Sequence, residues 1–283
     1  MVCAAAIAAG LLATGCSAGL TGSAANVTQP AIAATPTAPA TGYDGLIQLP
    51  LSAYGTSEQD DVLLYRTNEA LITRCMKGRG HASYSSQNTT RPAAKTKEEK
   101  EAIHPAGAWG YIGSATAKRI GFHVAVPLSA TKGPTGQALK DYNACFDEAD
   151  KQLPSLAGTQ GGKLTHDLFT QSFQQTGSDS RVGAARERWS ACMNAAGHPA
   201  GAPEKLANGP WDSDKPTANE IAAAMADESC TRSSRLAAVY FAVLAGYQRQ
   251  LISANTKVLT GYRKQVQEQI DQATRLLAAT ATT

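Results

Sequence analysis

Cysteine is the residue type with the clearest chemical pattern in this sequence. Residues 75–81 (CMKGRGH) return as residues 192–198 (CMNAAGH), and each copy carries a glycine five residues after its cysteine. A glycine at that place can adopt positive φ and end a helix, so we interpret both copies as helix ends. One further cysteine follows each copy, Cys145 after the first and Cys230 after the second. This arrangement indicates disulfide chemistry.

Four cysteines allow three disulfide pairings. Bonds within each copy, Cys75 with Cys145 and Cys192 with Cys230, would close long loops. Each bond would then stabilise the fold by about 4 kcal/mol in the chain-entropy view of disulfides. The competing pairing joins the two copies through Cys75 and Cys192. We predict the first pairing because each of its bonds stays within one copy.

Histidines are the other residues that could hold a metal ion. Close spacings such as His-x3-His or Cys-x2-Cys are typical of metal sites, and neither spacing occurs here. We therefore expect no bound metal and no cofactor, and we expect structural or surface roles for all five histidines: His81, His104, His123, His166 and His198.

Motifs of nucleophilic catalysis and nucleotide binding give no coherent site in the sequence. Gly-x-Ser-x-Gly occurs only at residues 15–19 (GCSAG), directly after the N-terminal apolar run, and there is neither a Ser-x2-Lys with its partner motifs nor a glycine-rich phosphate loop. The neighbouring acids Asp147 and Glu148 fit a solvated helix face beside Cys145. We expect no catalytic residue. A hydrolase that uses Asp, Glu or His from residues 79–136 stays as the alternative.

Composition narrows the class of protein further. The 283 residues are 43% hydrophobic, which is enough for a globular core. The net charge of +3 is spread along the chain without a run of basic residues, and only 6% of residues are aromatic. Nucleic-acid binding is therefore not expected, because both the electrostatic footprint and the stacking side chains are missing.

The N-terminal residues carry a targeting signal. Residues 2–13 are apolar and uncharged, a length typical of a signal-peptide core and too short to span a bilayer. No Lys or Arg precedes this run, so we expect translation to start upstream. The residues Leu12-Ala13-Thr14-Gly15-Cys16 resemble the lipobox of bacterial lipoproteins. That resemblance implies that residues 1–15 are removed and that Cys16 is acylated; ordinary cleavage and secretion are the alternative.

The segment after Cys16 differs from the rest of the chain. Residues 16–42 consist mainly of Ala, Thr, Ser, Gly and Pro without apolar periodicity. Such a composition predicts a flexible tether, which we place between the membrane and a helical domain of residues 43–283. The repeat divides this domain into halves of about residues 43–160 and 161–283.

Apolar side chains at steps of three and four predict the helices of this domain. A capping box at Thr217 and Glu220 opens the longest element, which we expect to continue from residue 221 to residue 277. The candidate bend sites in it are Gly246, Asn255 and Gly261. The other expected helices cover residues 59–78, 115–119, 137–153, 164–175 and 179–197.

These elements predict a mainly α fold of two disulfide-stapled helix pairs with a long C-terminal helix. The last helix has glutamine-rich faces that could receive a partner helix. We expect its apolar stripe to pack internally over residues 221–252, and we leave both interpretations open for residues 258–277. The glutamines concerned are Gln248, Gln250, Gln265, Gln267, Gln269 and Gln272.

Several segments together are similar to a group of secreted or lipid-anchored actinomycete proteins. They are residues 49–54 (LPLSAY), the two Cys-Met copies, Trp189-Ser190-Ala191 before Cys192, residues 111–123 and residues 220–230. The resemblance covers nearly all of the chain from Leu49 and implies export and a helical domain, with no activity attached. We therefore predict a non-catalytic lipoprotein on the extracytoplasmic face of the membrane, which binds another envelope protein or the wall polymer.

Overall fold

The computed structural model describes residues 27–85, 111–122, 133–211 and 215–280. These residues form helices and connecting turns, and no strand occurs among them. The mainly α fold predicted from the sequence is thus confirmed. The signal peptide predicted for residues 1–15 and the predicted acylation site Cys16 lie outside the described residues, as do His104 and His123. Within the described part, no helix has both the length and the hydropathy needed to cross a membrane.

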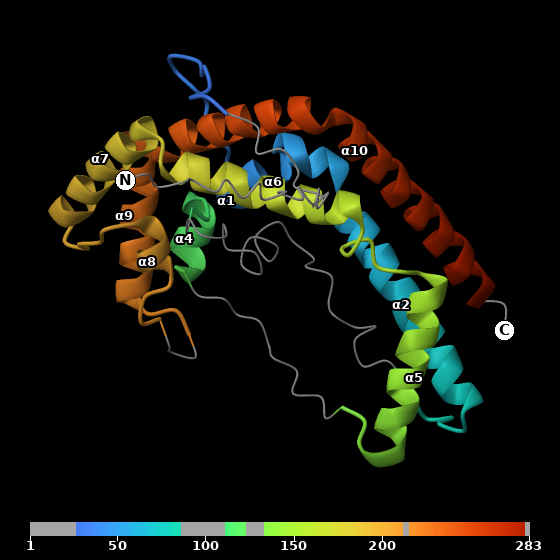
Figure 1. Ribbon diagram of the computed structural model, residues 1–283. Coiled ribbons are helices and arrows are strands. Elements are labelled where there is room, and N and C mark those ends of the chain that lie inside the picture. Colours follow the sequence, from blue (N-terminus) through green and yellow to red (C-terminus); the bar gives the residue numbers. More distant parts are fainter. Residues whose placement is uncertain (1–26, 86–110, 123–132, 212–214, 281–283) are drawn as a thin grey trace, which may run out of the picture.

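The helices are arranged along one long helix, α10, which arches over the molecule from end to end (Figure 1). At one end α10 packs with α7 and α9, and at the other end with α2. Helix α6 and the short elements α1 and η1 lie beneath its middle. The elements are α1 (Gly42–Ile47), the 3-10 helix η1 (Pro50–Tyr54), α2 (Glu58–Gly78), α4 (Ser114–Ile120), α5 (Gly136–Gln152), α6 (Gln160–Gly177), α7 (Ser180–Ala195), α8 (Pro203–Ala207), α9 (Ala218–Ser233) and α10 (Leu236–Thr280).

Each end of the molecule contains one stapled helix pair. A disulfide joins Cys75 of α2 to Cys145 of α5, and a second joins Cys192 of α7 to Cys230 of α9. The two Cα atoms are 5.6 Å apart in both bonds, within the usual range for disulfides. The predicted pairing is confirmed, and the competing bond between Cys75 and Cys192 is not formed.

The repeated motif ends a helix in both copies. Gly80 and Gly197 have positive φ values of 93° and 81°. The next residue in each copy donates a backbone hydrogen bond back into the last turn, from His81 to the Met76 carbonyl at 3.1 Å and from His198 to the Met193 carbonyl at 3.0 Å. This 6→1 bond defines a Schellman motif, so the glycines serve as helix stops.

The expected single helix over residues 221–277 is wrong, because the chain breaks between α9 and α10. Arg235 occupies the left-handed region with φ 61°, and the Ser234 hydroxyl accepts a hydrogen bond of 3.3 Å from the Leu236 amide. Residues 231–235 (TRSSR) offer no apolar side chain that would keep a continuous helix on the core. Ser234 can cap the following helix, which favours the start of a new helix at Leu236.

Helix α10 bends at one of the three candidate sites, Asn255. Its backbone leaves helical geometry (φ −127°, ψ 16°), and its side-chain amide donates to the Leu251 carbonyl at 2.8 Å. A side chain that competes for a carbonyl of its own helix is a recognised cause of such a kink. The bend lets α10 follow both helix pairs.

Three apolar clusters form the core, and α10 contributes to all of them. The largest surrounds Trp189 where α7, α9 and the start of α10 meet. A second joins Ile72 of α2 and Cys145 of α5 to Ala273 of α10. The third lies in the middle of the molecule and consists of Leu51, Leu168, Leu251 and Leu259.

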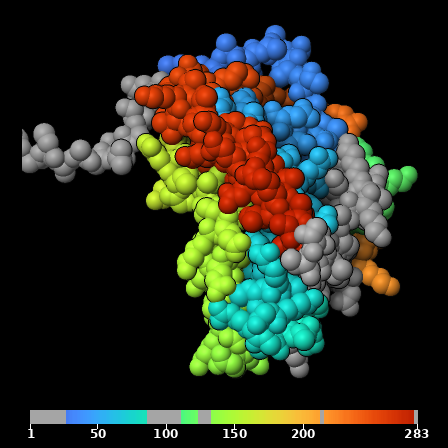
Figure 2. All heavy atoms as spheres, turned by 90° about the vertical axis from the view of Figure 1, so that its right-hand side faces the viewer, coloured from blue at the N-terminus to red at the C-terminus, as the bar shows by residue number. Residues whose placement is uncertain are grey.

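The C-terminal part of α10 packs against its own domain, as Figure 2 illustrates for the surface above α2 and α6. Leu259, Val266 and Ala273 are fully buried. Four of the six glutamines proposed as a docking face donate or accept hydrogen bonds with other segments of the same chain. They are Gln248 with Leu51 and Ser172, Gln250 with Thr28, Gln269 with Pro154, and Gln272 with Gln152.

The segment predicted as a flexible tether is fixed to the domain over residues 27–41, so that prediction is wrong for this stretch. Thr28 and Gln250 exchange two hydrogen bonds of 3.0 Å, and Arg181 donates to the Pro30 carbonyl at 2.8 Å. Pro30 packs on Gly246 of α10, where a Cβ would come within 2.5 Å of the proline ring. We refer to residues 27–41 as the N-terminal strap.

Candidate functional site

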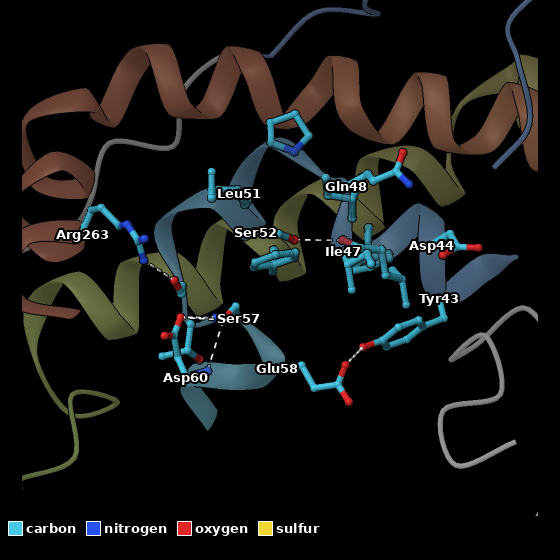
Figure 3. Close-up of a pocket in the computed structure, with 18 residues that line it drawn as sticks. Tyr43, Asp44, Ile47, Gln48, Leu51, Ser52, Ser57, Glu58, Asp60 and Arg263 are labelled. Carbon is cyan, nitrogen blue, oxygen red and sulfur yellow. Dashed lines mark hydrogen bonds between the residues drawn. The ribbon is translucent and has the colours of Figure 1, made fainter. Parts of the chain in front are cut away.

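An open groove of about 1440 Å³ lies beside α1 (Figure 3). It is formed by α1, η1, the first turn of α2, two phenylalanines of α6 and one arginine of α10. We call it the α1–α2 groove. Its eighteen lining residues are Tyr43, Asp44, Leu46, Ile47, Gln48, Leu49, Pro50, Leu51, Ser52, Ala53, Gly55, Thr56, Ser57, Glu58, Asp60, Phe169, Phe173 and Arg263.

Local capping explains why the chain turns sharply enough to make this groove. The Thr41 hydroxyl accepts a hydrogen bond from the Asp44 amide and starts α1. A capping box between Ser57 and Asp60 starts α2. Because each cap satisfies backbone amides that would otherwise lack partners, both helices can begin where the chain changes direction.

The middle of the groove is anchored from below by a buried amide. The Leu51 amide donates to Gln248 Oε1 at 3.0 Å, and Gln248 Nε2 donates to the Ser172 hydroxyl at 3.2 Å. Gln248 is fully buried. It therefore ties η1, α6 and α10 together, which fixes the floor of the groove to the rigid part of the fold.

The floor of the groove is apolar and partly open to solvent. The rings of Phe169 and Phe173 stack with centroids 6.4 Å apart. Ile47 at the end of α1 stays 51% exposed, although large aliphatic side chains usually gain from burial. An apolar floor with an exposed isoleucine is suited to contact with an apolar ligand or partner.

The rim of the groove is acidic. Its described lining contains the carboxylates of Asp44, Glu58 and Asp60 and the guanidinium of Arg263. Glu58 accepts a hydrogen bond of 3.4 Å from the Tyr43 hydroxyl, and these side chains point toward one another across the groove (Figure 3). Arg263 donates to the Gly55 carbonyl at 2.7 Å. The local charge is thus negative, opposite in sign to the net charge of the whole chain.

The described lining of this groove brings no recognised catalytic arrangement together. Its described lining contains neither histidine nor cysteine, and two of its three carboxylates accept hydrogen bonds in helix caps from Thr41 and Ser57. A catalytic site needs a nucleophile or an acid–base pair that converges on one point. The groove instead combines apolar contact area with fixed negative charge.

The three histidines that the structure describes, His81, His166 and His198, do not line the groove. His81 Nε2 is 2.9 Å from Asp141 Oδ2, next to the ion pair of 2.5 Å between Arg79 and Glu148. The hydrogen bond with His81 is the largest cause of a lowered pKa for the Asp141 carboxyl. These groups connect the two helices of the Cys75–Cys145 pair. Among the described residues, no group of three or more His, Cys, Asp or Glu could hold a metal ion.

A buried polar cluster that the sequence analysis did not identify lies between α4, α7 and α9. Asp227 is fully buried and accepts hydrogen bonds from Trp189 Nε1 at 2.7 Å and from the Thr231 hydroxyl at 3.2 Å. Glu228 accepts one of 2.9 Å from the Gly113 amide. Burial, the largest cause, raises the pKa of the Asp227 carboxyl to about 8. This cluster holds helices together and lines no part of the groove.

The groove itself was also missed, although one sequence feature pointed to it. Residues 49–54 (LPLSAY) contribute to the sequence analysis only as part of a resemblance, yet Pro50–Tyr54 form η1 and residues 49–53 line the groove. The side chains of Tyr43 and Glu58 meet there only because α1 and α2 fold toward one another. Periodicity along a single helix does not contain that information.

Comparison of the chain with protein-family models, curated proteins and solved structures gives no match in any of the three. The cellular compartment is therefore inferred from the chain's own disulfides. The two disulfides indicate an oxidising, extracytoplasmic environment, because cytosolic thiols are normally kept reduced.

Proposed function

We propose that this protein is a lipid-anchored accessory protein on the extracytoplasmic face of the cell membrane, which binds an envelope partner through the α1–α2 groove and catalyses no reaction. The observation that carries the proposal is the groove around Ile47. It combines an apolar floor, an exposed isoleucine and an acidic rim on a support held rigid by buried contacts of Gln248. Covering such an apolar surface with a partner lowers the free energy of the system and so favours binding.

The anchor part of the proposal rests on the similarity of residues 12–16 to a lipobox and on the disulfides, which require export. In this proposal Cys16 carries the lipid. Cys16→Ser should release the protein into the medium or leave an unprocessed precursor, and labelled fatty acid should no longer enter it. Unchanged membrane retention and labelling in the variant would refute the anchor.

The binding part is tested by photocrosslinking in the cells that make the protein. A photoreactive amino acid at Ile47 should give a discrete adduct. The same amino acid at Leu139 of α5, which is also exposed and lies outside the groove, serves as the matched control. An adduct at Ile47 and none at Leu139 would support binding through the groove. Equal adducts at both positions, or none at Ile47, would contradict it.

A further inference from the structure

The charge of the α1–α2 groove points to the chemistry of its partner. Three carboxylates and one guanidinium belong to the described lining, whereas the whole chain has a net charge of +3. The acidic rim is therefore a local feature of the groove. A ligand that carries positive charge would be attracted to this rim.

The position of the carboxylates relative to the apolar floor restricts the shape of a ligand that fits the groove. Figure 3 shows Asp44 and Asp60 toward opposite ends of the groove and Glu58 between them. Ile47 and the phenylalanine pair provide apolar contacts alongside this row. A matching ligand must thus offer several positive charges along one side and apolar groups along the other.

An extended peptide meets this condition because successive side chains of a strand point to opposite sides. The volume of about 1440 Å³ also exceeds the roughly 300–1,000 Å³ of pockets that enclose small molecules. We infer that the α1–α2 groove receives an extended peptide segment of a partner protein in which apolar residues alternate with lysine or arginine. This inference rests on the proposed function and specifies the partner's chemistry.

The inference is tested with three labelled octapeptides and the full-length protein with both disulfides intact. One peptide alternates leucine with lysine, the second leucine with glutamate, and the third serine with lysine. Fluorescence anisotropy at low salt should detect binding of the leucine–lysine peptide only, because both charge and apolar contact are required. Added salt should weaken this binding, since charges on an exposed rim are screened.

Variants locate the binding site. Ile47→Ser should weaken binding of the leucine–lysine peptide by about tenfold, as expected for loss of one buried aliphatic contact. Glu58→Gln should weaken it by about two- to fivefold, as expected for an exposed ion pair. The matched controls on α5 are Leu139→Ser and Asp147→Asn, which make the same kinds of change at exposed positions outside the groove. Both controls should bind like the unmodified protein.

Several outcomes would overturn the inference. These are equal binding of the glutamate peptide, an equal loss in the control variants, or no binding of the leucine–lysine peptide. Concentration-dependent self-association that Ile47→Ser abolishes would instead identify a second copy of this chain as the occupant. An adduct at Ile47 in cells without peptide binding would refute only the peptide chemistry. Peptide binding without an adduct in cells would leave the chemistry intact and refute the proposed envelope function.

Discussion

The indole nitrogen of Trp189 donates a hydrogen bond of 2.7 Å to the Asp227 carboxylate inside the core between α7 and α9. Both side chains are fully buried, and Oδ2 of Asp227 has no hydrogen-bond partner among the described residues. A buried carboxyl group in this position is more stable with its proton bound, since an ionised group would lose its hydration. Because this carboxyl group is buried, the free energy of unfolding depends on the pH at which it ionises.

The first prediction concerns this pH dependence. Because the pKa of Asp227 is about 8 in the folded protein and near 3.8 in an unfolded chain, folding favours the protonated form. The resulting stabilisation is complete below about pH 4 and is lost as the pH rises toward 8. Asp227→Asn keeps the acceptor for Trp189 and cannot ionise. As the pH rises across this range, the free energy of unfolding of this variant should therefore increase relative to that of the unmodified protein. The total difference should be several kcal/mol, since each unit of pKa shift corresponds to about 1.4 kcal/mol.

Urea denaturation at pH values from 4.5 to 9 measures this difference directly. Asp167→Asn, at an exposed position on α6, is the control and should show a nearly constant difference. A difference for Asp227→Asn that does not change with pH would mean that Asp227 is already ionised in the folded protein. The assignment of a protonated core carboxyl would then be wrong.

A second prediction compares Gly161 of α6, which lies at the contact with α10, with Gly261 of α10, which faces open space. A Cβ on Gly161 would come within 2.4 Å of the Tyr262 Cβ, whereas a Cβ on Gly261 would have no atom within 4 Å. Gly161→Ala should thus force the helices apart and destabilise the protein by about 1–3 kcal/mol. Gly261→Ala should stabilise it by up to about 1 kcal/mol because alanine is the better helix former. Thermal melting distinguishes the two, and a shift in the same direction for both variants would contradict the close helix contact.

The break between α9 and α10 supplies the third prediction. Arg235 is exposed and has φ 61°, a conformation that costs an L-residue roughly 1–2 kcal/mol and glycine almost nothing. Arg235→Gly should raise the melting temperature by a few degrees, although the flexibility of glycine in the unfolded chain offsets part of the gain. Arg74→Gly, within α2, should lower the melting temperature. A loss of stability in both variants would indicate that Arg235 belongs to a continuous helix.

The features that the sequence predicted correctly are encoded within a few neighbouring residues. The capping box of Thr217 and Glu220 and the glycine stops at Gly80 and Gly197 are local, and the structure contains each of them. The pairing of the cysteines was predicted from the repeat, because each bond stays within one copy. Fold class therefore required little long-range information.

The features that were missed depend on contacts between distant segments. Residues 27–41 have the composition of a disordered tether, yet side chains of Arg181 and Gln250 satisfy the backbone of Thr28 and Pro30 across about 150 to 220 residues. The break at Arg235 lacks the glycine or proline that usually signals one, and the apolar gap over residues 231–235 was the available clue. The groove needs α1 and α2 to meet, which no single-helix pattern specifies.

The last prediction concerns the C-terminal part of α10, where the sequence left internal packing and partner docking both open. Leu259 lies in the central cluster with Leu51 and Leu168, and Ala273 packs in the cluster of α2 and α5. The Thr67 hydroxyl also donates to the Ala273 carbonyl at 3.2 Å. Removal of residues 256–283 should therefore expose two clusters and lower the melting temperature by well over several degrees.

Two further variants keep this prediction interpretable if the shortened chain does not fold. Leu259→Ala should cost about 2–5 kcal/mol, as for other buried leucines. Removal of residues 278–283 alone should change little, because Ala278 and Ala279 are exposed. Calorimetry measures all three proteins. If Leu259→Ala and the longer truncation melt like the unmodified chain while the truncated protein no longer forms its crosslinks in the envelope, this part of α10 is a docking helix and the internal packing described for it is wrong.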